Sequence, residues 1–229
     1  PLLYEGRHNS ITVNEKPLDN FFDKVSEPLT KYGKAGLKRK YSSKNAIKKA
    51  DQVIYDRAWD ISEHFVDFLQ GTGFKGQLVA PNKTSAILYR KYLNEIGKVK
   101  AEVVISGSDT RENHIDAFEE NENLVQSFHK SMMDKYGTQE KYEKSVINAF
   151  KKQEYPEIII VVDKLLTGFD APNNRVLYLT RSLKEHTLLQ AIARVNRVAE
   201  GKDYGLIIDY YGNLENLDRA IEIYTSKDG

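Results

Sequence analysis

A run of five consecutive apolar residues, 158–162, follows a break at Pro156 and constrains the fold more than any other segment. A strand that is apolar on both faces must be covered on both faces, which is typical of a parallel sheet. Shorter apolar runs at residues 176–179 and 206–208 predict two further strands, with a helix over residues 187–198 between them. Strands that alternate with helices at this spacing predict a three-layer α/β domain, with a central parallel sheet flanked by helices.

The same alternation is present earlier in the chain. Apolar residues at helical spacing predict a helix from Ser43 to a stop at Gly71, and short apolar runs predict strands at residues 77–80 and 101–105. A helix between these strands is predicted to stop at Gly97, and a later helical stretch over residues 124–150 is predicted to break at Gly137. We also expect a short strand at residues 11–13, a loop at 108–122 and a final helix over 214–224.

Composition excludes several classes of protein. With 40% hydrophobic and 29% charged residues the chain is typical of a soluble globular protein, and it has no apolar run of the roughly 18–20 residues that a membrane span needs. It has no cysteine, so disulfides and thiolate metal sites are excluded, which fits a cytoplasmic protein. The five histidines lack metal-ligand spacing, so no metal site is predicted. The chain begins at Pro1 without an initiator methionine, and we expect it to be part of a longer protein.

Charge is unevenly distributed, although the net charge is only +1. The basic segment, residues 31–49, has no acid and eight basic residues, which are Lys31, Lys34, Lys38, Arg39, Lys40, Lys44, Lys48 and Lys49. Such a segment could neutralise several phosphates of a nucleic acid without reading its sequence. It could equally be a solvated loop that leads into a helix.

Short, polar or glycine residues follow every predicted strand. Ligands of parallel sheets bind at the carboxyl ends of the strands, so these residues are candidates for a site. They are Asn82, Lys83 and Thr84 after Pro81, Ser106 and Gly107, residues 163–170, Thr180 and Arg181, and Asp209. Backbone N–H groups and hydroxyls at such positions suit phosphates, but they also suit ordinary turns from strand to helix.

The predicted helix over residues 187–198 carries Gln190, Arg194 and Arg197 at spacings of four and three, which places them on one stripe. Two arginines on an otherwise apolar helix favour an anionic ligand, because guanidinium groups stabilise charge on a transferring phosphoryl group. Two structural alternatives stay open. Thr187 and Gln190 fit a capping box, and the arginines could simply pair with acids such as Asp170.

The amino-acid sequences of these segments resemble those of a known family. The sequence Leu-Leu-Thr-Gly-Phe-Asp-Ala-Pro at residues 165–172, followed by Leu-Leu-Gln-Ala-Ile-Ala-Arg-Val-Asn-Arg at 188–197, resembles motifs V and VI of superfamily 2 helicases. Its particular form is similar to the R (HsdR-type) subunit of type I restriction enzymes. Residues 3–7, 78–82 and 205–212 also resemble that family, while residues 107–153 do not contribute. The resemblance implies a RecA-like domain, the second motor lobe of such a subunit.

Roles for individual residues follow from the resemblance. It implies that Arg197 is an arginine finger, that Arg194 supports it or couples it to Asp170, and that Gln190 senses the nucleotide. It implies that Asp170 and Gly168 lie at the nucleotide, and that Thr167 and Gly168 meet DNA phosphate or relay nucleotide state. The implied DNA-contacting residues are Asn82, Lys83, Thr84, Ser106, Gly107 and Thr167, to which the basic segment adds Lys38, Arg39 and Lys40.

The implied function is ATP-dependent translocation of double-stranded DNA. ATP with Mg²⁺ would be held mainly by a first RecA-like lobe, because no P-loop lysine is present: residues 71–77 have the glycine spacing but Gln77 replaces the lysine. This chain is therefore not expected to hydrolyse ATP alone. We expect residues 1–42 to be a lead-in and 43–229 to be the second lobe. The implied partners are double-stranded DNA, the first lobe and nuclease domain of the same chain, and modification and specificity subunits. The alternatives are a lobe of another superfamily 2 DNA or RNA helicase, and an inactive interaction module.

Overall fold

The computed structural model describes residues 2–7, 31–106, 119–152, 154–166, 169–197 and 199–213, with only the backbone described at 31–49, 119–122 and 185. The strand predicted at residues 11–13 and the helix predicted at 214–224 lie outside these ranges. Two compact units divide the chain: Asn9–Arg57, which holds the basic segment, and Pro1–His8 with Ala58–Gly229, which holds the sheet. The predicted boundary between a lead-in and a motor lobe at residue 43 stays a prediction.

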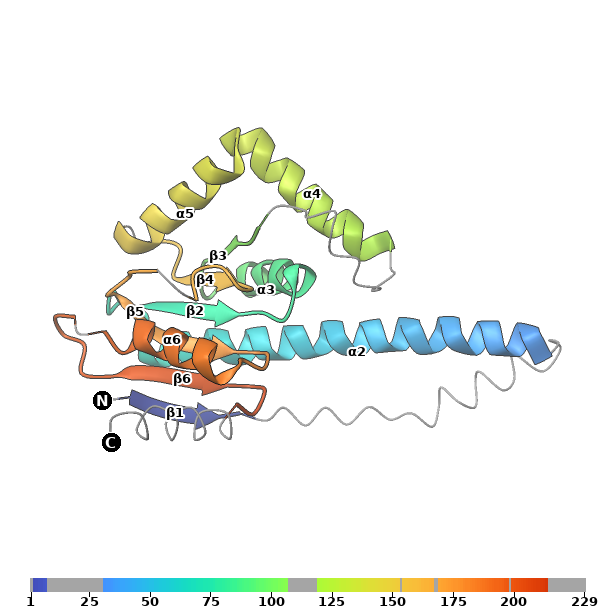
Figure 1. Ribbon diagram of the computed structural model, residues 1–229, viewed down its shortest axis with the longest axis horizontal. Coiled ribbons are helices and arrows are strands. Elements are labelled where there is room, and N and C mark those ends of the chain that lie inside the picture. The colour runs from blue at the N-terminus through green and yellow to red at the C-terminus, as the bar shows by residue number, and fades with distance from the viewer. Residues whose placement is uncertain are drawn as a thin grey trace. The chain divides into compact units, whose positions relative to one another are not determined.

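Six parallel strands form one sheet within the described residues (Figure 1). They are β1 (Leu2–Gly6), β2 (Lys75–Val79), β3 (Ala101–Val104), β4 (Ile158–Val161), β5 (Asn174–Leu179) and β6 (Gly205–Asp209), in the order β1-β6-β5-β2-β4-β3. The prediction of a parallel sheet is confirmed, and β4 is buried along its whole length between β2 and β3. The strand β1 was not foreseen, because this edge strand is half exposed and lacks a continuous apolar run.

Five helices accompany the sheet in the part of the chain that the structure describes. They are α2 (Lys31–Phe68), α3 (Lys83–Ile96), α4 (Glu119–Tyr136), α5 (Gln139–Lys152) and α6 (Glu185–Val195). The predicted stops at Gly97 and Gly137 are confirmed, and both glycines have the positive φ that favours glycine at a helix end. No helix of the described residues combines the length and apolarity needed to cross a bilayer.

The starts of helices α2 and α4 differ from the sequence predictions. The helix α2 begins at Lys31 instead of Ser43, so the basic segment is helical and the loop interpretation of it is wrong. Lysine and arginine have high helix propensity and no proline interrupts the segment, which is why the helix extends so far. The helix α4 begins at Glu119, inside the segment predicted to be a loop over 108–122.

Helices pack on both faces of the sheet. Successive side chains of β5 point to opposite faces, and those on each face contact a helix. Leu177 and Leu179 belong to one buried cluster with Phe150 of α5 and Leu188 of α6. Tyr178 points to the opposite face, where its hydroxyl lies 2.8 Å from Nδ1 of His64 in α2. Burial lowers the pKa of His64 to about 4, so this imidazole is neutral at pH 7. The predicted three-layer arrangement is confirmed.

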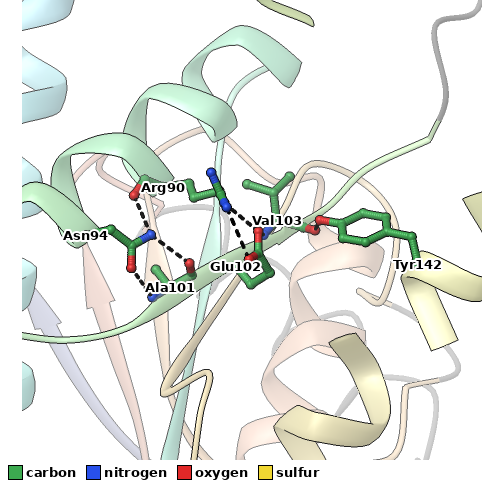
Figure 2. Close-up of polar contacts among 6 residues, drawn as sticks. All are labelled: Arg90, Asn94, Ala101, Glu102, Val103 and Tyr142. Carbon is green, nitrogen blue, oxygen red and sulfur yellow. Dashed lines mark hydrogen bonds and ion pairs between the residues drawn. The ribbon is translucent and has the colours of Figure 1, made fainter. Parts of the chain in front are cut away.

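Side chains close the free edge of β3, which is the outermost strand at one side of the sheet (Figure 2). Asn94 of α3 donates from Nδ2 to the Ala101 carbonyl (2.9 Å), and its Oδ1 accepts the Ala101 N–H (3.1 Å). The Tyr142 hydroxyl of α5 donates to the Val103 carbonyl. An open edge would be free to pair with another strand, so these contacts both anchor the helices and protect the edge.

We expect Asn94→Ala to lower the free energy of unfolding by about 1–3 kcal/mol, because it leaves two backbone groups of Ala101 without partners. Urea denaturation followed by circular dichroism measures the change. Gln126→Ala, at an exposed position of α4, is the control and should change stability little. Equal stability of the two variants would show that water replaces the Asn94 contacts at no cost.

Candidate functional site at the carboxyl edge of the sheet

Because all strands are parallel, their carboxyl ends meet at one edge. The residues that follow four neighbouring strands there are Asn82, Ser106, Asp163 and Arg181, and Asp209 ends β6. The strand-end candidates of the sequence are thus brought to the same side of the molecule. Three of them, Gly107, Thr167 and Gly168, lie outside the described residues.

At the end of β2, Asn82 caps helix α3. Its backbone is extended and its Oδ1 accepts the Ser85 N–H at 2.8 Å. Lys83 and Thr84 form the first turn of α3 and are half-buried, while Ser106 is exposed after β3. The Asn82 side chain therefore caps α3. A DNA-contacting role for these four residues stays a prediction.

Helix α6 is shorter than predicted, which changes the arginine stripe. The helix begins at Glu185 and ends at Val195, with Asn196 as its C-cap, so Arg197 lies beyond it. Gln190 and Arg194 are one turn apart on the helix, but Arg197 is presented from the following loop. The predicted helix over residues 187–198 is wrong at both ends. The helix begins two residues earlier, and it ends at Val195 although the apolar pattern continues to Val198.

The capping-box alternative for Gln190 is also wrong. Lys184 is the N-cap, without a side-chain bond, and Thr187 lies inside the helix. Nε2 of Gln190 instead lies 2.9 Å from Nε2 of His186, one turn earlier on α6. Gln190 and His186 thus form a polar pair on the first turns of α6.

The two arginines have different surroundings. Arg197 forms an ion pair with Asp170, and their side chains are 43% and 57% exposed. Arg194 is half-buried, and its buried Nε has no hydrogen-bond partner among the residues that the structure describes. An exposed ion pair contributes only about 0–1 kcal/mol, so Arg197 is held loosely. Asp170 therefore pairs with Arg197, and among the described residues Arg194 has no such ion pair.

The turn after β6 lies at the same carboxyl edge of the sheet and is hydrogen-bonded to a buried aspartate. Asp209 is fully buried and accepts hydrogen bonds from the Tyr4 hydroxyl and from the N–H groups of Tyr211 (2.9 Å), Gly212 (3.1 Å) and Asn213. Burial alone would raise the pKa of Asp209, but these hydrogen bonds lower it below its ordinary value. Sequence patterns mark Asp209 only as a strand-end residue and do not single out Asn213. An aspartate three residues before Gly212 is a turn signal that could have indicated this arrangement.

The end of α6 lies directly against the start of β6. A Cβ atom at Gly205 would come within 2.5 Å of the Val195 carbonyl oxygen and 2.8 Å of its carbon. Only glycine permits this backbone contact. The contact fixes the last residue of α6, two positions before Arg197.

A sequence profile decides the family. The profile described as "Type I restriction enzyme subunit R domain 3" matches residues 72–212, which include five strands of the sheet and the strand-end residues from Asn82 to Asp209. The chain belongs to this family. It is 36% identical over 179 residues to a putative type I restriction enzyme MjaVIIIP endonuclease subunit of Methanocaldococcus jannaschii, covering 77% of this chain and 17% of that protein. It is 29% identical over 247 residues to the HindI endonuclease subunit of Haemophilus influenzae, covering 100% of this chain and 21% of that protein.

A solved structure supports the fold. A fragment of a putative HsdR subunit of a type I restriction enzyme from Vibrio vulnificus YJ016 is similar with a TM-score of 0.50 and 18% identity, over 74% of this chain and 30% of that one. The fold is an α/β, RecA-like fold with a central parallel sheet. The chain spans about a fifth of the length of the curated relatives.

We expect Gly205→Ala to lower the free energy of unfolding by about 1–3 kcal/mol, because the added methyl group must displace the backbone at Val195. Gly6→Ala is the matched control, since nothing lies within 4 Å of a Cβ atom at that position of β1. Thermal and urea denaturation of both variants measure the difference. Equal stabilities would mean that the end of α6 is free to move away from β6.

Proposed function

We propose that this domain is the second motor lobe of a type I restriction enzyme R subunit and takes part in ATP-driven translocation of double-stranded DNA. The observation that carries the proposal is the loose ion pair of Arg197 with Asp170 at the carboxyl edge of the sheet. A guanidinium that is exposed, and that can leave its partner at a cost of about 1 kcal/mol or less, is suited to reach a phosphate held by a neighbouring lobe.

The residues around Arg197 fit a nucleotide phosphate. Arg194 has a buried Nε with no partner in the described part of the chain, and Gln190 lies one turn before it on α6. When bound with Mg²⁺, ATP supplies the phosphoryl group whose transfer releases the free energy for movement. In our proposal Arg197 stabilises charge on that group, Arg194 orients Arg197, and Gln190 with Asp170 responds to the nucleotide. We also propose a nucleotide contact for Gly168, which lies outside the described residues.

Contact with DNA is proposed for the strand-end residues on the other half of the edge. Asn82, Lys83 and Thr84 begin α3, where backbone N–H groups suit a phosphate, and Ser106 is exposed after β3. Gly107 and Thr167 complete the proposed track. Lys38, Arg39 and Lys40 would add sequence-independent affinity from α2, whose helical backbone displays basic residues on successive turns.

The remaining partners are proposed from the relatives. Those proteins are described as endonuclease subunits and are about five times as long as this chain. We therefore propose that a first RecA-like lobe and a nuclease domain belong to the same polypeptide, and that modification and specificity subunits assemble with it. The family membership disfavours a lobe of an RNA helicase, because the matched profile is that of the restriction subunit.

We expect Arg197→Ala, in the full-length polypeptide, to lower the DNA-stimulated ATPase rate by roughly 10³–10⁵-fold, the range found for arginine fingers. A steady-state ATPase assay with saturating DNA measures the rate. Arg175→Ala is the matched control: this arginine stacks on Phe74 and Tyr204 at the opposite, amino end of β5 and should leave the rate near wild type. An unchanged rate in Arg197→Ala would contradict the arginine finger.

We expect combined reversal of Lys38, Arg39 and Lys40 to glutamate to weaken DNA binding and to flatten its salt dependence. Each lost phosphate contact lowers the slope of log affinity against log salt by about 0.9. Fluorescence anisotropy with a labelled duplex at several salt concentrations measures both quantities. Reversal of Lys130, Lys141 and Lys144, which are exposed on α4 and α5, controls for net charge. If both triple variants behave alike, the basic segment does not contact DNA.

A further inference from the structure

A groove lies beside β3 at the outer edge of the sheet, between α3 and α5 (Figure 1). It encloses about 530 Å³, and its lining includes Lys100 and the first two residues of β3, together with Tyr155 and Pro156, which precede β4. The groove therefore lies at the amino ends of β3 and β4. Asn82 and Ser106, which belong to the proposed DNA track, follow the opposite, carboxyl ends of β2 and β3.

The edge of β3 that borders the groove is closed to a further strand, because its polar backbone groups are already bonded (Figure 2). The Ala101 N–H and carbonyl both contact Asn94, and the Val103 carbonyl accepts the Tyr142 hydroxyl. The Val103 N–H donates to Oε1 of Glu102 at 3.2 Å. Pairing with a strand of another chain needs unpaired backbone groups, so an occupant of the groove must be recognised by side chains.

The described lining of the groove carries three cations and one acid. Arg90 of α3 contacts the acid, Glu102, through both Nε and Nη2. Lys91 and Lys100 are exposed, and neither forms an ion pair within the described residues. The neighbouring carboxylate of Glu157 accepts the backbone N–H of Lys100 at 2.9 Å. The acids at the groove thus have donors of their own, and two ammonium groups can receive carboxylates of an occupant.

Apolar and aromatic side chains complete the lining. Val146 and Ala149 lie on neighbouring turns of α5, and Tyr136 is the last residue of α4. Tyr155 is 49% exposed and precedes Pro156. An exposed aromatic ring and two ammonium groups in one groove suit a peptide that carries both a large apolar side chain and carboxylates.

The charges of the groove disfavour nucleic acid as its occupant. A phosphate backbone is negative along its whole length, so it would meet the carboxylates of Glu102 and Glu157 as well as the two lysines. A peptide can place its acids at the lysines alone. The distance of the groove from the strand-end residues, at the other end of β3, agrees with this choice.

The size of the groove favours a segment of the same polypeptide over a separate protein. A space of about 530 Å³ holds only a few side chains, and exposed ion pairs add little affinity. A tethered segment binds such a groove nevertheless, because a short flexible tether gives an effective concentration on the order of millimolar. The chain spans about a fifth of the length of the curated relatives, so most of such a polypeptide lies outside this domain.

We propose that the groove beside β3 docks an acidic segment of another domain of the same polypeptide. Its carboxylates pair with Lys91 and Lys100, and an apolar side chain packs against Tyr155. This docking rests on the proposed place of the domain in a longer R subunit, but it is independent of the role of Arg197. It fixes the outer edge of the sheet to a neighbouring domain.

Site-specific cross-linking in the full-length polypeptide tests the docking. The photoreactive amino acid p-benzoylphenylalanine replaces Tyr155, and mass spectrometry after irradiation locates the peptide to which it is joined. We expect an intramolecular cross-link to a segment rich in aspartate and glutamate. The same replacement at Tyr211, which is 57% exposed in the turn after β6, is the matched control and should not cross-link to that segment.

Charge reversal then tests the two lysines. Lys91→Glu combined with Lys100→Glu should lower the yield of the Tyr155 cross-link by at least about 3-fold, because two attractive pairs become repulsive. Reversal of Lys130 and Lys141, which are exposed outside the groove, should leave the yield unchanged. Thermal denaturation verifies that each variant is folded.

Several outcomes would overturn the docking. They are a cross-link from position 155 to DNA, to a separate subunit or to a segment without acids, the absence of any cross-link, and a yield that the Lys91 and Lys100 reversals leave unchanged. Cross-linking requires no turnover of ATP, so these outcomes leave the ATPase test of Arg197 unaffected. An unchanged ATPase in Arg197→Ala, conversely, contradicts the proposed motor role and not the docking.

Discussion

A parallel sheet that is buried on both faces presents polar groups to a ligand at the two ends where its strands begin and finish. In this chain β2, β4 and β5 are buried along almost their whole length, so chemistry is confined to the loops that follow them. Because every strand runs in the same direction, these loops stand together. The order of the strands thereby decides which loops are neighbours.

Charged groups at this edge fall into two classes that differ in burial. Asp209 is buried, and it stays ionised because hydrogen bonds from Tyr4 and the following turn replace water. Arg197 and Asp170 are exposed and share a single contact that water can replace. The first class holds the edge in shape, whereas the second can rearrange at little cost. A site that must respond to a ligand held elsewhere needs both.

Much of the fold could be predicted from the sequence, because its signals are local. The apolar run of β4 and the glycines at 97 and 137 act through neighbouring residues, and each prediction from them is confirmed. The strand β1 could not be predicted, since its partner β6 lies about two hundred residues away and its own pattern is weak. The end of α6 differs from the prediction because the apolar pattern continues to Val198, whereas the helix ends at Val195, beside Gly205 of β6.

The sequence predicted which residues lie at the candidate site, but it did not predict which of them contact one another. Position after a strand marks Asp163, Arg181 and Asp209, yet nothing in their spacing says that Arg181 reaches Asp163 or that Asn213 joins them. Pairing depends on the order of the strands, which the sequence alone leaves open. The sequences of residues 165–172 and 188–197 identified the family without revealing these contacts.

The glycine at the start of β6 has a mechanical consequence. With no side chain at Gly205, the backbone of α6 rests on the backbone of the sheet. A soft layer of side chains would absorb a small displacement, but two backbones in contact transmit it. The last residue of α6 therefore cannot move toward the sheet without displacing the start of β6.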